Sequence, residues 1–215
     1  MTRAALFGLA LLGAVAACRM AEDKSQHLDP ATIVLSEAQN VRTDAVGNVA
    51  SPATFVLFDV DNRNDTEALV TVGGEWRDAA GASPGRLRKE TLRIPPRGRR
   101  TFALLDDELK ARPTAARADV RIFNATVPLN GSPMRVVDGH VYEDQGRAVV
   151  AAYIVNDAPR GGRAIVFAGF HDAAGKPMMR PFELFEIGGS TKRPARFVGP
   201  PGSKTAYIFL GDIVY

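Results

Sequence analysis

The stretch Glu75-Trp76-Arg77-Asp78-Ala79-Ala80-Gly81 returns 94 positions later as Gly169-Phe170-His171-Asp172-Ala173-Ala174-Gly175. Both copies pass from an aromatic residue through a basic-type residue into the identical run Asp-Ala-Ala-Gly. The same displacement works upstream without a gap, and it pairs Asn62 with Asn156, Val56 with Val150, Val60 with Ile154 and Val72 with Val166. A single displacement that matches apolar positions over about twenty residues predicts two related domains in tandem.

Each repeat consists of short segments rich in Val, Ile, Phe and Tyr, separated by clusters of Gly, Pro, Asn and Asp, and this pattern is typical of β-strands. The predicted strands are residues 32–35, 54–60, 68–76, 87–94, 100–105 and 118–123 in the first repeat, and 135–142, 148–155, 163–170, 182–187, 195–198 and 205–210 in the second. About six or seven strands in about ninety residues is the scale of an immunoglobulin-like sandwich. The predicted fold is therefore all-β, with two tandem immunoglobulin/fibronectin-III-like β-sandwiches.

Two local features qualify this pattern. Asp-Ala-Ala-Gly is expected to form the turn after the third strand, because Gly81 and Gly175 can adopt a positive φ angle. No segment after the N-terminal apolar run shows a convincing helical period, although residues 106–112 could form one or two helical turns.

The N-terminus carries the features of an export signal. Arg3 precedes an apolar run over residues 4–17, which is typical of a signal peptide. About fourteen residues are too few to span a bilayer core that needs roughly twenty helical residues. The run ends in Val15-Ala16-Ala17-Cys18, which resembles the lipobox of bacterial lipoproteins, and this resemblance implies acylation of Cys18. The alternative is a secreted protein cleaved near Ala17 with Cys18 as a free thiol.

Further inferences concern anchoring and domain boundaries. Cys18 is the only cysteine, so the chain cannot form an internal disulfide. In lipoproteins of this type a residue other than Asp after the cysteine, here Arg19, implies sorting to the outer membrane. The predicted organisation is a signal peptide at residues 1–17, a lipidated cysteine and polar tether at 18–31, and two sandwich repeats at 32–126 and 127–215.

Alternation along the strands separates a core face from a second face. The predicted core positions are Val70, Val72 and Trp76, with their counterparts Ala164, Val166, Ala168 and Phe170. The second face is polar in the first repeat, at Asp59, Asp61, Thr71 and Glu75, but apolar in the second, at Tyr153, Val155, Ile165 and Phe167. Contiguous exposed apolar surface usually marks a contact. These four apolar residues are therefore expected to pack on the first domain or on a partner.

Basic residues form two clusters, at Arg86, Arg88 and Lys89 and at Arg97, Arg99 and Arg100. In an exported protein they indicate contact with anionic polymers or lipid head groups of the envelope rather than with nucleic acid. The formal net charge is only +3, which keeps open the alternative of a sheet edge protected by charge.

Several motifs fail as chemical sites. Residues 199–205 lack the glycine spacing of a nucleotide-binding P-loop. Residues 59–65 are acidic, but Arg63 and Asn64 occupy positions that a calcium-binding EF-hand loop reserves for a ligand and a glycine. His171 aligns with Arg77 and is expected to be exposed, and strand geometry is expected to separate His140 from its acidic neighbours. The carboxylates at 106–108 are expected to mark a solvated turn. No catalytic residue, metal or cofactor is therefore predicted.

Asn62 at a strand end, the run 76–81, Ile94-Pro95-Pro96 and the strand at 118–123 together resemble small YcfL-type periplasmic lipoproteins. The second repeat is similar more loosely, since Ile187-Gly188-Gly189 replaces Ile-Pro-Pro. The resemblance implies location and fold but supplies no active site.

The expected function is that of a lipid-anchored, non-catalytic protein that binds or scaffolds another envelope component, most directly an envelope protein. An enzyme or enzyme regulator acting on peptidoglycan or glycan, and a binder of a small ligand or metal between the domains, are the alternatives. The oligomeric state stays open.

Overall fold

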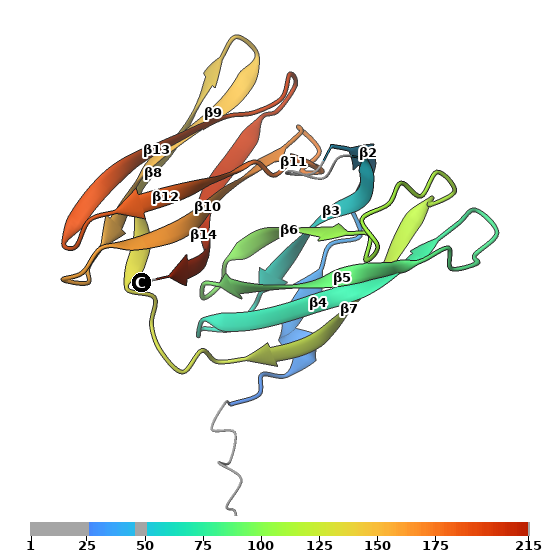
Figure 1. Cartoon of the computed structure of the whole chain (residues 1–215), viewed down its shortest axis with the longest axis horizontal. Coiled ribbons are helices and arrows are strands. Elements are labelled where there is room, and N and C mark those ends of the chain that lie inside the picture. The colour runs from blue at the N-terminus through green and yellow to red at the C-terminus, as the bar shows by residue number, and fades with distance from the viewer. Residues whose placement is uncertain (1–25, 46–50, 215) are drawn as a thin grey trace, which may run out of the picture.

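The computed structural model describes residues 26–45 and 51–214. These residues form two β-sandwiches in tandem, joined by a short segment after Thr126 (Figure 1). The elements are η1 (Pro30–Thr32), β1 (Ile33–Leu35), β2 (Asn40–Asp44), β3 (Ala53–Asn62), β4 (Ala68–Arg77), β5 (Arg86–Ile94), β6 (Arg99–Leu105), β7 (Arg117–Thr126), β8 (Met134–Asp144), β9 (Arg147–Asn156), β10 (Gly162–His171), β11 (Pro177–Met179), β12 (Phe182–Ile187), β13 (Thr191–Val198) and β14 (Thr205–Val214).

Both sandwiches have the same strand order. In the first, β4 lies between β5 and β7 in one sheet, and β3 lies between β6 and the pair β1 and β2 in the other. In the second, β10 lies between β14 and the pair β11 and β12, while β9 lies between β8 and β13. All the pairings are antiparallel. The tandem β-sandwich fold predicted from the repeat is therefore confirmed.

The predicted strands are all present, most of them extended by one to four residues at an end. Two short edge strands, β2 and β11, had no clear sequence signal. Residues 106–112 form no helical turn; they consist of non-helical turns and irregular backbone. The Asp106 side chain accepts hydrogen bonds from the backbone N–H groups of Glu108 and Lys110, at 3.1 and 3.2 Å, so that it competes with helix formation.

The repeat extends to individual hydrogen bonds. The buried Asn62 amide donates to the carbonyls of Thr66, Ile94 and Pro95, and its Oδ1 accepts from the N–H group two residues later. Asn156 donates to the carbonyls four residues later and at positions 187 and 188, and it also accepts from the N–H group two residues later. Each asparagine thus ties the end of its strand to two connections that cross between the sheets.

The Asp-Ala-Ala-Gly turns are also equivalent. Asp78 Oδ1 accepts from the N–H groups two and four residues later, and so does Asp172 Oδ1. Gly81 and Gly175 have φ angles of 88° and 78°, as expected for a turn that needs the left-handed region.

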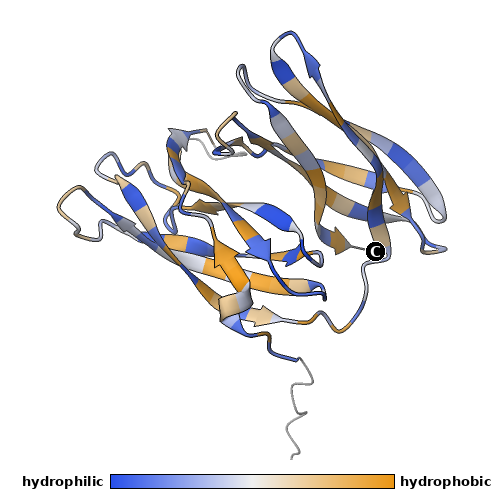
Figure 2. Cartoon of the chain, turned by 180° about the vertical axis from the view of Figure 1, so that it is seen from behind, coloured by the Kyte–Doolittle hydropathy of each residue, from blue (hydrophilic) through white to orange (hydrophobic). Residues whose placement is uncertain are grey.

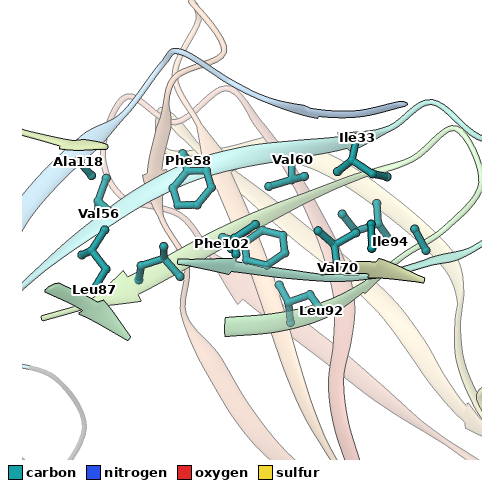
Figure 3. Close-up of a cluster of buried hydrophobic side chains, with 14 of the residues drawn as sticks. Ile33, Val56, Phe58, Val60, Val70, Leu87, Leu92, Ile94, Phe102 and Ala118 are labelled. Carbon is teal, nitrogen blue, oxygen red and sulfur yellow. The ribbon is translucent and has the colours of Figure 1, made fainter. Parts of the chain in front are cut away.

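Each sandwich has its own hydrophobic core, and apolar and polar residues alternate along the strands (Figure 2). The first core contains Trp76. It also contains Phe58 and Phe102 (Figure 3), whose rings stack at 5.9 Å between centroids. Two further members of this first core, Phe167 and Phe209, come from the second sandwich. The two repeats are therefore joined through a shared core.

Candidate functional site

The outer face of the β10, β12 and β14 sheet packs against the first sandwich. Phe167 and Phe209 stack at 5.3 Å between ring centroids and are 9% and 0% exposed. They enter the first core cluster, where Phe102 and Leu92 are also members. The first sandwich consequently completes its core with side chains from the second.

A buried polar cluster bridges the same interface. His171 Nε2 lies 2.9 Å from Asp59 Oδ2, and Asp59 Oδ1 accepts a hydrogen bond from Thr101 Oγ1 at 2.7 Å. Thr101 Oγ1 is also 2.6 Å from the hydroxyl of Tyr207, whose ring stacks on His171 at 5.6 Å between centroids. Burial raises the pKa of Tyr207, and the Asp59 carboxylate adds to this effect, so the phenol stays protonated. Gly169 is required here, since a Cβ at this position would lie 2.7 Å from Thr101 Oγ1.

Charged side chains close the edges of this contact. Arg180 donates to Glu90 Oε1 at 2.7 Å and to the Thr101 carbonyl at 3.1 Å, and its guanidinium lies over the Phe167 ring. Asn40 Nδ2 donates to the Pro177 carbonyl at 2.9 Å. The interface therefore combines apolar packing with specific hydrogen bonds from both sandwiches.

The expectation that His171 is exposed is wrong. His171 is 4% exposed and Asp59, on the face predicted to be solvated, is 2% exposed. Alignment with Arg77 misled the prediction because the equivalent surfaces of the two repeats have different surroundings. A sequence signal did exist, since the face that carries His171 is the one enriched in apolar residues.

The four apolar residues expected to share a face lie on two different sheets. Ile165 and Phe167 belong to β10 and pack on the first sandwich, which is the first of the two alternatives for them. Tyr153 and Val155 belong to β9, in the opposite sheet, and do not join the interdomain contact. Tyr153 is 37% exposed. These four residues therefore do not form one surface.

The outer face of the β8, β9 and β13 sheet, here called the outer β9 face, is defined by strand register. Its rows across β8, β9 and β13 are Tyr142, Val149 and Val198; His140, Ala151 and Arg196; Val137, Tyr153 and Pro194; and Arg135, Val155 and Lys192. Tyr142 and Val198 are 41% and 39% exposed, and His140 stacks on Tyr142 at 5.9 Å between centroids. Apolar and aromatic side chains thus run along the middle of an outward-facing sheet.

Cations border the outer β9 face along its edge strand β13. Lys192 Nζ lies 4.6 Å from the centroid of the Tyr153 ring and has no carboxylate partner within residues 26–45 and 51–214. Arg196 donates to the Tyr142 hydroxyl at 3.1 Å and lies 3.8 Å from Asp144. On the opposite edge Arg135 forms an ion pair with Asp157 at 2.7 Å.

The six basic residues singled out in the sequence do not form one patch. Arg86, Arg88 and Lys89 lie on β5, where Arg88 donates to the Asp107 carbonyl and Lys89 lies 3.9 Å from the Phe123 ring centroid. The others lie at the start of β6 or just before it: Arg97 forms an ion pair with Asp65, and Arg99 with Asp61. Arg100 turns toward the domain interface, where its guanidinium lies over Phe209.

Asp106 is a buried structural carboxylate rather than part of a solvated turn. It accepts from Trp76 Nε1 at 3.0 Å and from Arg112 Nε at 2.7 Å, and it is fully buried. Burial opposes ionisation, but hydrogen bonds from Arg112, Lys110 N–H and Trp76 outweigh it, so the pKa of Asp106 is lowered. Asp107 and Glu108 are exposed. Of these three acidic residues, Asp106, which accepts the hydrogen bond from Trp76, is thus the only buried one.

The remaining motifs serve the fold. The acidic run at 59–65 supplies Asp59 to the interface and Asp61 and Asp65 to ion pairs with Arg99 and Arg97. In the loop at 199–205, Ser203 Oγ accepts from Ala148 N–H and donates to a carbonyl of its own turn. No group of three His, Cys, Asp or Glu side chains suited to a metal ion occurs in the described part of the chain.

Comparison with known proteins gives no family. No family model and no curated protein matches the chain. A solved structure of the N-terminal CBM22-1-CBM22-2 tandem domain from Paenibacillus barcinonensis Xyn10C is similar at 8% identity, covering 87% of this chain and 89% of that one, with a TM-score of 0.14. A TM-score this low supports no statement about fold or function. The YcfL-type resemblance stays a prediction.

Membrane attachment rests on the sequence. The predicted signal peptide, Cys18 and most of the predicted tether lie outside the described residues. Within residues 26–45 and 51–214, no helix has the length and apolar character needed to span a membrane.

Proposed function

We propose that this protein is a lipid-anchored, non-catalytic component of the bacterial envelope that binds another envelope protein through its outer β9 face. The observation that carries the proposal is the composition of this face. An outward-facing antiparallel sheet normally carries polar side chains on its solvent face. On this face Tyr142, Tyr153 and Val198 are exposed and Ala151 and Val155 are half-buried, whereas Val149 is fully buried. Tyrosine is enriched at the centres of protein interfaces, and contiguous exposed apolar surface marks contact sites.

The cations indicate the chemistry of the partner. Lys192 and Arg196 border the apolar strip along β13, and Lys192 has no carboxylate partner within the described residues. Charge complementarity across an interface favours the correct partner and steers its approach. The expected partner surface therefore carries apolar side chains beside Asp or Glu residues that meet β13. Anchoring through the predicted lipid on Cys18 would hold such a partner at the membrane.

A photoreactive residue in place of Tyr153, introduced into the full chain in living cells, tests the proposal. The expected result is a crosslink to one defined protein that is lost when Lys192→Glu reverses the charge at the edge. Lys89→Glu is the matched control, because Lys89 lies over Phe123 as Lys192 lies over Tyr153, but on the first sandwich. A crosslink that survives Lys192→Glu, or one to glycan only, would contradict the proposal.

A further inference from the structure

A cavity of about 330 Å³ opens at the boundary between the two sandwiches. Its lining includes Arg99 and Arg100 from β6, His171 from β10, and Thr205 and Tyr207 from β14. Side chains able to donate hydrogen bonds thus surround it from three strands of both domains. No carboxylate is among its lining residues.

Arg100 is the unusual member of this set. Its guanidinium packs over Phe209, and its one hydrogen bond within the described residues runs from Nη1 to the Arg99 carbonyl at 2.8 Å. Its Nε is buried and has no hydrogen-bond partner among the described residues. Burial lowers the pKa of Arg100 to about 10, which expresses how poorly its positive charge is compensated.

The neighbouring carboxylates are already engaged. Asp61 binds Arg99 through two hydrogen bonds of 2.6 and 3.1 Å, and Asp59 faces His171 and Thr101. Glu67, the other acid near Arg100, forms an ion pair with Arg93 at 3.1 Å. Within residues 26–45 and 51–214, Arg100 therefore has no ion-pair partner of its own. A largely buried cation without a counter-charge is costly, and a bound anion removes that cost.

The imidazole of His171 lines the same cavity. Because its Nε2 donates to the Asp59 carboxylate, Nδ1 donates to an anion only in the imidazolium form. Its Nε2 is directed at Asp59, and its Nδ1 makes no hydrogen bond to the described part of the chain. We infer that the cavity between the two sandwiches binds a phosphate oxyanion, held by Arg100 with Arg99, His171, Thr205 and Tyr207 around it. The guanidinium groups of Arg99 and Arg100 on β6 and the Thr205 hydroxyl on β14 offer donors from two strands. Donors that converge in this way suit a tetrahedral oxyanion better than a planar carboxylate, and charge-assisted hydrogen bonds to phosphate are strong. This site is separate from the outer β9 face and does not depend on the proposed partner.

Thermal unfolding of the full chain in sodium phosphate tests the inference, with sodium chloride and sodium acetate at equal ionic strength as references. The Tm is expected to rise with the logarithm of the phosphate concentration above Kd, by roughly 5–10 °C at about 100 times Kd. The rise is expected to vanish in Arg100→Gln and persist in Arg86→Gln, the same change at an exposed position of β5. No rise beyond that in sodium chloride, a rise kept in Arg100→Gln, or an equal rise in acetate would each overturn the inference.

A second measurement covers the case in which Arg100→Gln does not fold. The ring resonances of His171 and Tyr207 in the unmodified chain are expected to shift saturably with phosphate, and their constancy would refute the site. Phosphatidylcholine vesicles with and without phosphatidic acid then separate the two sources of phosphate. A lipid head group is indicated if Arg86→Gln still binds the vesicles with phosphatidic acid and Arg100→Gln does not. If Arg100→Gln does not fold, displacement of the unmodified chain from these vesicles by free phosphate indicates the same. Binding of free phosphate alone indicates a soluble anion.

Discussion

His171 of the second sandwich donates from Nε2 to the Asp59 carboxylate of the first across 2.9 Å, although the two residues are 112 positions apart in the chain. Both side chains are almost fully buried. A carboxylate buried in this way must be hydrogen-bonded, and here the bonds come from His171, Thr101 and more distantly Tyr207. The pair therefore specifies how the two repeats dock.

A double-mutant cycle on Asp59 and His171 is expected to show that the two side chains stabilise the fold together. Asp59→Ala and His171→Ala should each destabilise the chain, and the double variant should lose less than the sum of the two by about 0.5–3 kcal/mol. Urea denaturation of the four proteins measures this coupling. Additivity within about 0.5 kcal/mol would show that the two side chains do not support each other.

Phe209 is expected to stabilise the first sandwich although it belongs to the second. Because its ring is fully buried in the first core cluster, Phe209→Ala should lower the free energy of unfolding by about 3–5 kcal/mol. Phe123→Ala, at a ring that is 40% exposed, serves as the control and should cost less than about 1 kcal/mol. Equal effects in urea denaturation would contradict the shared core.

Asp106 should make stability depend on acid pH. Because its pKa is lowered in the folded state, its contribution is present above the unfolded value of about 3.9 and is lost as the pH falls through the folded value. The stability difference between the unmodified chain and Asp106→Asn should therefore shrink below about pH 4. Urea midpoints recorded as a function of pH provide the measurement. A constant difference down to acid pH would mean that the ionised carboxylate is not what stabilises Trp76 and Arg112.

Cys18 is expected to determine membrane attachment. Cys18→Ser should move the protein from the membrane fraction to the soluble fraction of the envelope and abolish incorporation of labelled palmitate. A Ser25→Ala variant, changed in the predicted tether, should behave like the unmodified chain. Retention of Cys18→Ser in the membrane would exclude the lipid as the anchor.

The strands and the turns were predictable because they depend on local patterns. Alternation identified Val70 and Val166 as core positions, and the repeat placed both Asp-Ala-Ala-Gly turns. Alternation gives each strand two faces but does not reveal what covers the second one. Asp59 and His171 were misplaced for this reason, since their burial depends on the docking of two sheets that are distant in sequence. The burial of Phe167 in a contact was predicted, because an apolar residue on the second face indicates a contact. The sequence did not show which surface makes that contact.

Arg100 shows a different limit. A run of basic residues at the start of β6 predicts an exposed cluster, and Arg97 and Arg99 are exposed. Arg100 points to the other side of the same strand and meets Phe209. The cavity beside it contains residues from three strands, so only the docked structure brings its members together.

The two sandwiches form one unit, which uses the β10 sheet for the contact and leaves the outer β9 face free. The only tryptophan, Trp76, reports on the first sandwich, so its fluorescence can be followed while the second is weakened. Ile154→Ala removes a fully buried side chain from the second core and should cost about 2–5 kcal/mol. If the two sandwiches unfold together, the urea midpoint of Trp76 fluorescence falls with that of far-UV circular dichroism, and this is the result we expect. An unchanged Trp76 midpoint beside an earlier loss of β-structure would contradict it.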